Sequence, residues 1–525
     1  MSGPATTLRE LLHRRAGDDL SRLLLLFEGR SLSYGEFRRE VHRVANALLR
    51  LGVKKGDKLA LLVPNCPEFL LAVFAVAEIG AIFVPINTAL AAEETGYVID
   101  HSESSYLMTS QAFLPLVEQI KGGCARLKRV ISLGKGRQAG CLSWDELLHG
   151  ASSDPPPAHV GPEDTASITY TSGTTDRPKG VMLTQFAYAF APQKRAEALG
   201  WSEKDRAFVM LPLFHVNALC HMAIAMMSVG GSILLTEKFS ASRFWEEVRE
   251  YNVTTSSLMR TIPNILLSLP ERSDDAKNPL RLAVALLPPE VHLRFEERFN
   301  LTVVGSYSLT EDLLSVIGLQ DKSKRKLGSC GLPVAPEAHQ LRILKESGRG
   351  CAPGQLGEIV KQSPTMMKGY YKNPAATVEV LREGWLHTGD LGYLDEEGFL
   401  YFVDRKKDVI KRGDENISSE EVERVLNSHP LIVESAVIGI PDPIRQEEVK
   451  AYVVLKPPAT PESLAPEAIW DFCQVNLAAF KIPRYLEYRT ELPKTPSSKV
   501  QKSILRDEVK LPKGVVFDRF AGARK

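Results

Sequence analysis

The sequence predicts an α/β fold with a large N-terminal domain and a small α+β C-terminal domain. The chain has 525 residues, which exceeds the roughly 150 residues of an ordinary domain. In the N-terminal part, apolar segments of strand length alternate with segments of helical spacing, a pattern typical of parallel or mixed sheets covered by helices. A different α+β pattern begins near residue 404. We therefore expect domains over residues 1–404 and 405–525.

The N-terminal elements are predicted from apolar periodicity. A helix is expected over residues 35–52, since its apolar side chains recur at helical spacing. A buried strand Lys58–Val63, a helix 67–79 and a buried strand Ala81–Pro85 follow. Further strands of the same kind are predicted at Val209–Pro212, Ser232–Thr236 and Leu301–Val304. The Pro-rich segment Ala151–Pro162 is predicted to be a loop.

The C-terminal pattern mixes strands and helices over about 120 residues, the size of a small domain. Ser418 or Ser419 is expected to cap a helix that runs through Leu426, because serine side chains accept hydrogen bonds from the first turn of a helix. The other elements expected here are a strand Phe399–Val403, strands Ser435–Ile440 and Lys450–Leu455, and a helix Ala468–Asn476.

Charge and composition exclude several classes of protein. There are 65 basic and 64 acidic residues, so no general attraction to nucleic acid or to an anionic membrane is expected. The longest apolar stretch, Phe69–Ala77, is shorter than the about 20 residues needed to span a bilayer, and the N-terminus has no secretory apolar region. Seven dispersed cysteines indicate reduced thiols. We expect a cytoplasmic protein, and a homo-oligomer is compatible with this sequence.

The segment Tyr170–Gly180, YTSGTTDRPKG, carries the strongest signal for chemistry. Five hydroxyl-bearing residues surround Gly173, and Lys179 follows. Backbone N–H groups and hydroxyls of such a loop can turn toward phosphate oxygens, and the lysine can add a positive charge. The loop lacks the spacing of a Walker A motif. The predicted phosphate-binding residues are Thr171, Ser172, Gly173, Thr174, Thr175 and Lys179.

This segment resembles the phosphate-binding signature of the adenylate-forming superfamily, which includes acyl-CoA synthetases, peptide-synthetase adenylation domains and beetle luciferases. The resemblance covers residues 20–510. The segment Tyr307–Glu311, YSLTE, is similar to the family's Y-G-x-T-E. The resemblance implies that Tyr307 lies along the adenine, that Thr310 bonds the α-phosphate, and that Glu311 helps to hold Mg²⁺. Carboxylates combined with phosphate oxygens are the ligands Mg²⁺ prefers.

Two further motifs of the family follow in the same order. In WLHTGD, the resemblance implies that Asp390 binds both ribose hydroxyls, for which a carboxylate has suitable acceptors. In YFVDR, it implies that Arg405 contacts ribose and phosphate. The resemblance also places a domain hinge at Lys407, and a close approach of the backbone to the pantetheine arm of CoA at Gly413.

The segment Pro493–Lys502, PKTPSSKVQK, resembles the family's C-terminal motif. The resemblance implies that Lys499 offsets charge where the carboxylate attacks the α-phosphate, which is electrostatic stabilisation and positioning. The segment Leu211–Val216, LPLFHV, matches a family segment near the acyl-binding tunnel, and the resemblance implies that His215 lies there. The stretch Ala283–Glu290 lies where many relatives carry an adenine-binding loop.

The resemblance implies an ATP-dependent acid:CoA ligase that forms an acyl-AMP and then an acyl-CoA thioester, with ATP, Mg²⁺ and coenzyme A. The small domain would rotate about Lys407 between these steps. The strings Glu237–Thr254 and FVDRKKDVIKRGDENIS look similar to the crotonobetaine/carnitine-CoA ligase branch. The predicted substrate is a carnitine- or crotonobetaine-like acid or a fatty acid.

Three alternatives stay open at the level of sequence. A stand-alone adenylation enzyme would load a separate carrier protein, and a luciferase-like enzyme would add an oxygenase activity. A non-catalytic nucleotide-binding homologue would fit the four departures from the family pattern. These departures are Asp176, Ser308, Asp414 and Ser498.

Overall fold

Residues fall into two compact groups in the computed structural model, by the contacts among their Cα atoms. Unit 1 comprises Met1–Leu341 and Lys361–His387, and unit 2 comprises Arg342–Val360 and Thr388–Lys525. This division groups residues 388–404 with the C-terminal residues, and the domain boundary at residue 404 stays a prediction. The structure describes residues 4–134, 140–171, 177–258, 261–406, 408–412, 415–443, 445–494, 500–510 and 515–521.

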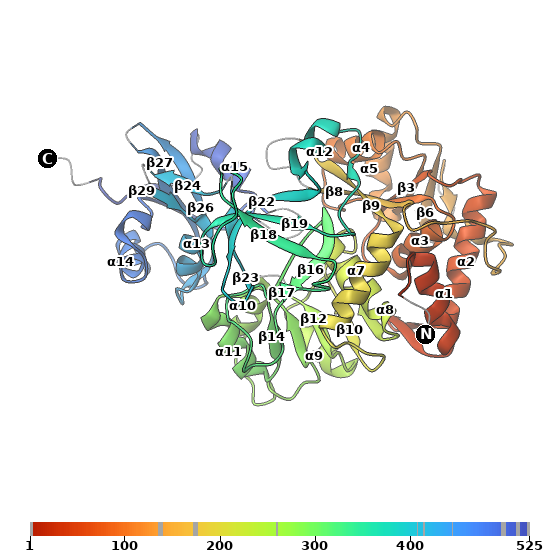
Figure 1. Ribbon diagram of the computed structural model, residues 1–525, viewed down its shortest axis with the longest axis horizontal. Coiled ribbons are helices and arrows are strands. Elements are labelled where there is room, and N and C mark those ends of the chain that lie inside the picture. The colour runs from red at the N-terminus through yellow and green to blue at the C-terminus, as the bar shows by residue number, and fades with distance from the viewer. Residues whose placement is uncertain are drawn as a thin grey trace. The chain divides into compact units, whose positions relative to one another are not determined.

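An eight-stranded mixed sheet lies in unit 1 (Figure 1). Its inner strands β3 (Lys58–Leu62) and β4 (Ile82–Pro85) are parallel and almost wholly buried, as expected for apolar strands covered on both faces. Both strands were predicted. The strand order is β20 (Gly369–Tyr370), β9 (Lys179–Thr184), β8 (Thr165–Thr171), β4, β3, β5 (Tyr106–Ser110), β6 (Arg129–Leu133) and β7 (Leu142–Ser143).

A second sheet of unit 1 has seven strands and is mainly parallel. The strands predicted at 232–236 and 301–304 are confirmed as β11 and β14. The strand order is β14 (Thr302–Val304), β13 (Leu282–Val284), β12 (Thr255–Ser257), β10 (Arg206–Val209), β11 (Ser232–Leu235), β1 (Leu23–Phe27) and β2 (Arg30–Ser33).

The bounds of the predicted strand Val209–Pro212 are wrong. The strand β10 ends at Val209, and the residues that follow form a turn. The buried side chain of Asn65 donates to the Leu211 carbonyl at 3.0 Å and accepts from the Leu213 N–H at 2.8 Å. These backbone groups are therefore bonded to a side chain instead of a neighbouring strand, and Pro212 has no N–H to offer a ladder.

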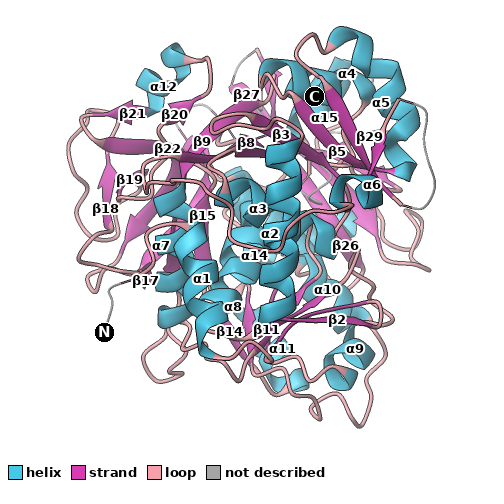
Figure 2. Cartoon of the chain, turned by 90° about the vertical axis from the view of Figure 1, so that its right-hand side faces the viewer, coloured by secondary structure: helices cyan, strands magenta, loops and turns pink. Residues whose placement is uncertain are grey.

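Helices cover the sheets of unit 1 (Figure 2). The predicted helix 35–52 is confirmed as α2, which Ser33 and Glu36 begin with a capping box. The predicted helix 67–79 is α3. The longer helices are α1 (Leu8–Asp18), α2 (Tyr34–Arg50), α3 (Pro67–Glu78), α4 (Ala92–His101), α7 (Gln185–Ala198), α10 (Thr261–Ser268) and α11 (Pro289–Phe299). The shorter ones are α5 (Leu114–Ile120), α6 (Trp144–Leu148), α8 (Ala225–Ser228), α9 (Phe244–Glu250), α12 (Pro374–Val380) and a π-helix Asn217–Ile224.

A short hairpin sheet completes unit 1, and a five-stranded sheet contains the points where the chain passes between the units. The hairpin strands are β15 (Ser306–Leu309), β16 (Asp312–Ile317) and β17 (Leu332–Pro333). The five-stranded sheet has the order β18 (Gln340–Leu344), β19 (Gly357–Gln362), β22 (Trp385–Leu394) and β21 (Leu381–Arg382), with β23 (Leu400–Arg405) paired to β22.

The C-terminal part of unit 2 is an α+β sheet structure, as predicted. Ser418 caps α13 through the Glu421 N–H, and the apolar faces of α13 and α14 share a core with the central strands. The sheet contains β25 (Glu415–Ile417), β24 (Ile410–Arg412), β27 (Gln446–Leu455), β28 (Tyr485–Arg489) and β29 (Val516–Asp518), with β26 (Ile432–Asp442) beside β27. The helices are α13 (Ser419–Asn427), α14 (Pro466–Asn476) and α15 (Lys502–Asp507).

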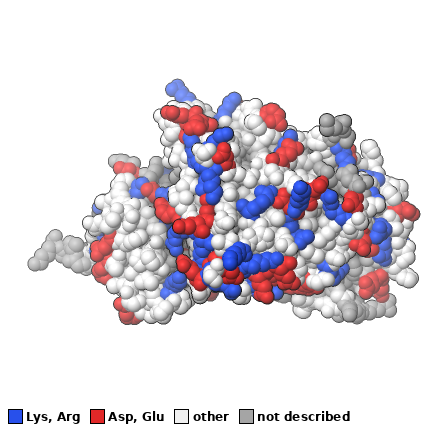
Figure 3. Space-filling view, turned by 90° about the horizontal axis from the view of Figure 1, so that it is seen from below, with Lys and Arg blue, Asp and Glu red and all other residues white. Residues whose placement is uncertain are grey.

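Charged side chains of both signs are interspersed on the face drawn in Figure 3. This distribution agrees with the near-zero net charge of the sequence. Within the described residues, no helix is long and apolar enough to cross a membrane.

Candidate active site

The predicted phosphate loop connects two antiparallel strands of the large sheet in unit 1. Thr171 at the end of β8 lies opposite Lys179 at the start of β9. Both residues therefore stand at the base of the loop. The predicted residues Ser172, Gly173, Thr174 and Thr175 lie outside the described part of the chain.

The second motif forms another hairpin in unit 1. Leu309 pairs with Asp312, so Thr310 and Glu311 occupy the turn between β15 and β16. Tyr307 is buried in β15, two residues before Leu309. Ser308, where the family has glycine, has no positive φ angle, so its Cβ is compatible with the local backbone.

Tyr370 joins these two motifs. Its hydroxyl donates to Glu311 Oε1 at 3.0 Å, and Lys179 Nζ lies 5.3 Å from the centroid of its ring. Tyr370 reaches this place because β20 pairs with β9, with Tyr370 opposite Val181. Burial and the neighbouring Glu311 charge raise the pKa of Tyr370, so its hydroxyl stays a donor. The structure thus brings Lys179 and Glu311 together around a tyrosine that sequence reasoning missed.

A buried ion pair lies directly after the turn that carries Glu311. Lys361 Nζ lies 2.9 Å from Asp312 Oδ2, and both side chains are fully buried. Asp312 also accepts hydrogen bonds from Ser363 and Thr365. Burial opposes ionisation of Asp312, but the charge of Lys361 and these hydrogen bonds hold the pKa of the carboxyl below its ordinary value. Because both charges are satisfied, the base of the hairpin is fixed.

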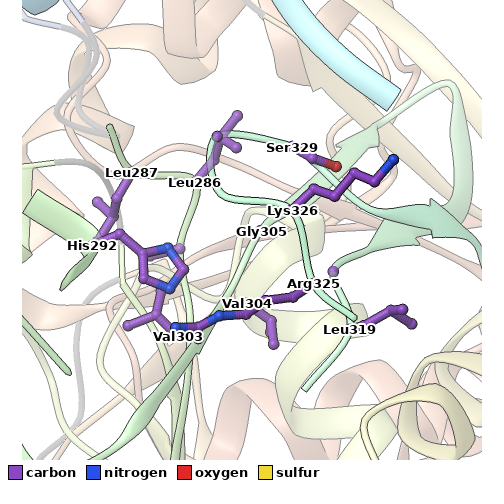
Figure 4. A pocket seen from close by; sticks show the side chains of 13 residues that line it. Leu286, Leu287, His292, Val303, Val304, Gly305, Leu319, Arg325, Lys326 and Ser329 are labelled. Carbon is purple, nitrogen blue, oxygen red and sulfur yellow. The ribbon is translucent and has the colours of Figure 1, made fainter. Parts of the chain in front are cut away.

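A small pocket lies beside this hairpin (Figure 4). The segment predicted from the resemblance to lie at the adenine supplies Ala285, Leu286 and Leu287 to its lining, and Gly305, just before β15, is also part of it. A Cβ on Gly305 would stand 2.2 Å from the Ser329 carbonyl oxygen, so only glycine allows this backbone approach. The pocket therefore places the segment Ala285–Leu287 next to the residue that precedes β15, the strand that carries Tyr307.

His215 lies just past the turn held by Asn65 and directly before the π-helix Asn217–Ile224. Its backbone N–H donates to the Pro212 carbonyl at 3.0 Å, and its half-buried ring packs against Phe214, with centroids 4.5 Å apart. The position of His215 is thus well fixed, and its role toward the acyl group stays a prediction.

Unit 2 brings the two predicted ribose residues together. Asp390 on β22 lies directly opposite Arg405 on β23, and Arg405 Nε is 3.6 Å from Asp390 Oδ1. The Asp390 side chain is only 6% exposed, whereas that of Arg405 is 44% exposed. The Asp390 N–H donates to Thr388 Oγ1 at 3.1 Å, which fixes the local turn. A carboxylate and a guanidinium in this arrangement can bind a diol and an anion.

The carboxylate of Asp404, beside Arg405, is hydrogen-bonded to the N-terminus of helix α13. Its Oδ2 accepts from the Ser419 N–H at 2.7 Å, from Ser419 Oγ at 2.8 Å and from the Glu420 N–H at 3.3 Å. A carboxylate at the N-terminus of a helix satisfies unpaired N–H groups and complements the helix dipole. Asp404 therefore fastens the end of β23 to α13, a contact that the motif alone did not reveal.

Lys494 and Val500, which flank residues 495–499, are joined by an antiparallel backbone bridge. Beyond it, the buried Lys502 ammonium pairs with Glu423 at 2.7 Å and donates to Ser419 Oγ at 2.6 Å. These contacts anchor both flanks of residues 495–499. The predicted residues Lys499, Lys407 and Gly413 themselves lie outside the described residues. Arg412 and Glu415, on either side of residues 413 and 414, pair with each other.

Comparison with protein families matches residues 12–371 to the AMP-binding enzyme family and residues 421–499 to the AMP-binding enzyme C-terminal domain. The first match covers more than half of the chain. The chain belongs to the AMP-binding enzyme family. The predicted superfamily is confirmed, and so is the fold class.

Curated relatives of this AMP-binding enzyme include two proteins named crotonobetaine/carnitine–CoA ligase. The protein from Salmonella arizonae is 39% identical over 516 residues, which cover 95% of this chain and 98% of the relative. The protein from Escherichia coli O17:K52:H18 is 38% identical over 486 residues, covering 90% of this chain and 93% of the relative. The predicted resemblance to this branch is confirmed.

Two solved structures similar to this AMP-binding enzyme are named as CoA ligases or synthetases. An anthranilate CoA ligase in complex with anthranoyl-AMP has a TM-score of 0.89 at 29% identity, covering 97% of this chain and 98% of that one. The O-succinylbenzoate coenzyme A synthetase from Bacillus subtilis, in complex with ATP and magnesium, has a TM-score of 0.82 at 32% identity. The match covers 95% of this chain and 99% of that one. The predicted class, an AMP-forming acid–thiol ligase, is confirmed, and ligases of this class use ATP, Mg²⁺ and CoA.

Replacing Tyr370 by phenylalanine is expected to raise the KM for Mg·ATP about ten- to 100-fold, with a smaller change in kcat. The variant keeps the ring under Lys179 but loses the hydrogen bond to Glu311 Oε1, and a hydrogen bond to a charged group contributes about 1.5–3 kcal/mol. Initial rates of pyrophosphate release against Mg·ATP concentration measure the effect. Tyr371→Phe is the matched control, because the Tyr371 hydroxyl bonds Glu103 instead. Equal kinetics for the two variants would contradict the role of Tyr370.

Proposed function

We propose that this AMP-binding enzyme joins a carboxylic acid to AMP, with release of pyrophosphate, and then transfers the acyl group to the thiol of coenzyme A. The observation that carries the proposal is the grouping of Lys179, Tyr370 and Glu311 in unit 1. A lysine at a phosphate loop and a carboxylate next to a hydroxyl are the groups required to bind Mg·ATP.

The donor atoms around Glu311 fit Mg²⁺. The carboxylate uses one oxygen to accept the Tyr370 hydrogen bond and has further lone pairs available, and Thr310 adds a neighbouring hydroxyl oxygen. Hard oxygen ligands of this kind suit Mg²⁺, which usually takes one or two carboxylates together with substrate phosphates. When bound, the ion would neutralise charge on the phosphates. Lys179 would add a positive charge to the same phosphates.

Within unit 2, Asp390 and Arg405 are proposed to hold the ribose and a phosphate. Their cross-strand pairing and the contrast between a buried carboxylate and a partly exposed guanidinium support this proposal. We further propose that Lys499 serves acyl-AMP formation, and that a rotation at Lys407 then brings Gly413 toward CoA. A hinge of a few residues that reorganises one site between two steps is a recognised mode of enzyme closure.

We propose a carnitine- or crotonobetaine-like acid as the substrate. The support is the identity of 38–39% to crotonobetaine/carnitine–CoA ligases over nearly the whole chain. Fatty acids are the second candidate, because a fatty acyl CoA synthetase from Mycobacterium tuberculosis is also similar, with 29% identity and a TM-score of 0.73. The free cysteines support a cytoplasmic location, in which thiols stay reduced. A homo-oligomer stays a prediction.

The proposal is tested by a screen for acid-dependent pyrophosphate release over betaine, short-chain, medium-chain, long-chain and aryl acids, with and without CoA. We expect release with carnitine or crotonobetaine to exceed that with fatty acids, and acyl-CoA to form when CoA is present. Fatty acids as the best substrates would overturn the substrate but keep the reaction. Acyl transfer to a carrier protein in place of CoA would favour the stand-alone adenylation enzyme, and absence of release across the panel would favour a non-catalytic homologue.

A further inference from the structure

Three side chains that bind transition metals in other proteins meet outside the proposed active site. His13 lies on α1, His42 on α2 and Glu78 at the end of α3. The three helices are side by side near the N-terminus (Figure 1). One ligand atom from each side chain lies within 4.8 Å of the others. None of these residues belongs to the nucleotide, acid or CoA motifs.

The hydrogen bond that His42 makes through Nδ1 leaves its other ring nitrogen, Nε2, available to bind a metal ion. Nδ1 lies 3.1 Å from the carbonyl oxygen of Ser153. Because a carbonyl only accepts, Nδ1 carries the proton and donates it. Nε2 therefore carries a lone pair, and this atom is buried without a hydrogen-bond partner. An imidazole that donates one N–H to a carbonyl and points the other nitrogen at an ion is the usual arrangement of a metal-bound histidine.

Glu78 supplies the negative charge of the cluster. Its carboxylate is fully buried, with Oε1 2.8 Å from His13 Nε2 and Oε2 3.5 Å from Arg9 Nε. Oε2 makes no hydrogen bond. The Arg9 guanidinium also donates to the backbone carbonyls of Glu78 and Ala158, at 3.1 and 2.7 Å, so its N–H groups are shared with other acceptors. A buried carboxylate with an unbonded oxygen would gain from a further cation.

We propose that His13, His42 and Glu78 bind a divalent transition-metal cation of the Zn²⁺ class. Two imidazole nitrogens and one carboxylate oxygen form a donor set that Zn²⁺ uses with a fourth position open to water, whereas Mg²⁺ requires mainly oxygen ligands. For His13 Nε2 to bind the ion, the proton that this nitrogen now shares with Glu78 Oε1 at 2.8 Å would be released. The His13 side chain is 32% exposed and provides the entry path that such a site needs.

The bound ion would join α1 to α2 and α3. It would also secure the Pro-rich segment after residue 151, since Ser153 bonds His42 and Ala158 bonds Arg9. The bound ion would thus stabilise the N-terminal part of unit 1. It is separate from the Mg²⁺ requirement of the ligase reaction.

The experiment uses the full-length protein, first treated with a chelator and then dialysed into buffer that contains Mg²⁺. Zn²⁺ is titrated by calorimetry, and Co²⁺ is titrated by visible absorption as a probe of ligand type. We expect the wild-type protein to bind about one equivalent of Zn²⁺ that His42→Gln does not bind. We also expect Zn²⁺ to raise the unfolding midpoint by about 1–3 °C in the wild type and not in the variant.

His149→Gln is the matched control, because His149 is exposed on the same unit and belongs to no ligand cluster among the described residues. It should bind Zn²⁺ as the wild type does. Circular dichroism verifies that both variants are folded, and Glu78→Gln, which keeps the size of the side chain, replaces His42→Gln should the latter fail to fold. Equal Zn²⁺ binding by wild type and variant, or a cobalt spectrum with thiolate charge-transfer bands, would overturn the proposal.

Discussion

Replacing Lys499 by alanine is expected to lower acid-dependent pyrophosphate release by about 100- to 1,000-fold, the usual effect of removing one preorganised group that stabilises transition-state charge. The lysine is proposed to offset charge as the carboxylate attacks the α-phosphate. Thioester formation from supplied acyl-AMP and CoA should stay near the wild-type rate, because no phosphate is attacked in that step. Rapid-mixing assays of each half-reaction measure the two rates separately.

Lys494→Ala is the matched control for this prediction. Lys494 lies on the other side of the same loop, where its ammonium pairs with Glu434 at 2.8 Å, and its backbone bridge to Val500 does not depend on the side chain. The control should retain adenylation within a few-fold of the wild type. An equal loss of both half-reactions in the Lys499 variant would contradict the assignment of this lysine to adenylation alone.

Replacing Glu311 by glutamine should reduce pyrophosphate release about 100-fold and raise the Mg²⁺ concentration needed for half-maximal rate. Glutamine has the same shape and can still accept the Tyr370 hydrogen bond, so the hairpin turn should be kept. It lacks the charge that a Mg²⁺ ligand provides. Rates measured over a wide range of Mg²⁺ at saturating ATP give both quantities.

Glu379→Gln is the matched control. The charge of Glu379 also raises the pKa of Tyr370, but less than burial and the charge of Glu311 do. Glu379 is exposed on α12, and its variant should keep the wild-type dependence on Mg²⁺. If the rate of the Glu311 variant depends on Mg²⁺ as the wild-type rate does, Glu311 is not the metal ligand, even if the variant has a lower maximal rate.

The sequence predicted those parts of the fold and site that are encoded locally. Continuous apolar runs identified β3 and β4, and helical spacing identified α2, because burial on both faces or on one stripe leaves a direct pattern in the chain. Ordered motifs likewise identified Lys179 and Glu311, whose side chains the structure brings together.

The rest depends on contacts between distant residues. Tyr370 lies 59 residues after Glu311, and only the pairing of β20 with β9 brings it to the site, so its own neighbourhood in the sequence gave no signal beyond two adjacent tyrosines. The end of β10 was misplaced for a similar reason, since Asn65, 146 residues before Leu211, takes the backbone groups that a strand would have used.

If the small domain rotates as proposed, the attachment of Asp404 to α13 would affect how often each pose of the enzyme is occupied. Asp404 precedes the proposed pivot at Lys407, and Ser419 and Glu420 follow it. Any rotation that carries α13 away must break these bonds, and a hydrogen bond to a buried charge is worth about 1.5–3 kcal/mol. One such bond would raise the population of the described pose, relative to the rotated pose, by about one to two orders of magnitude. The division of time between adenylation and thioester formation would then be set partly by a carboxylate engaged with a helix terminus instead of a substrate.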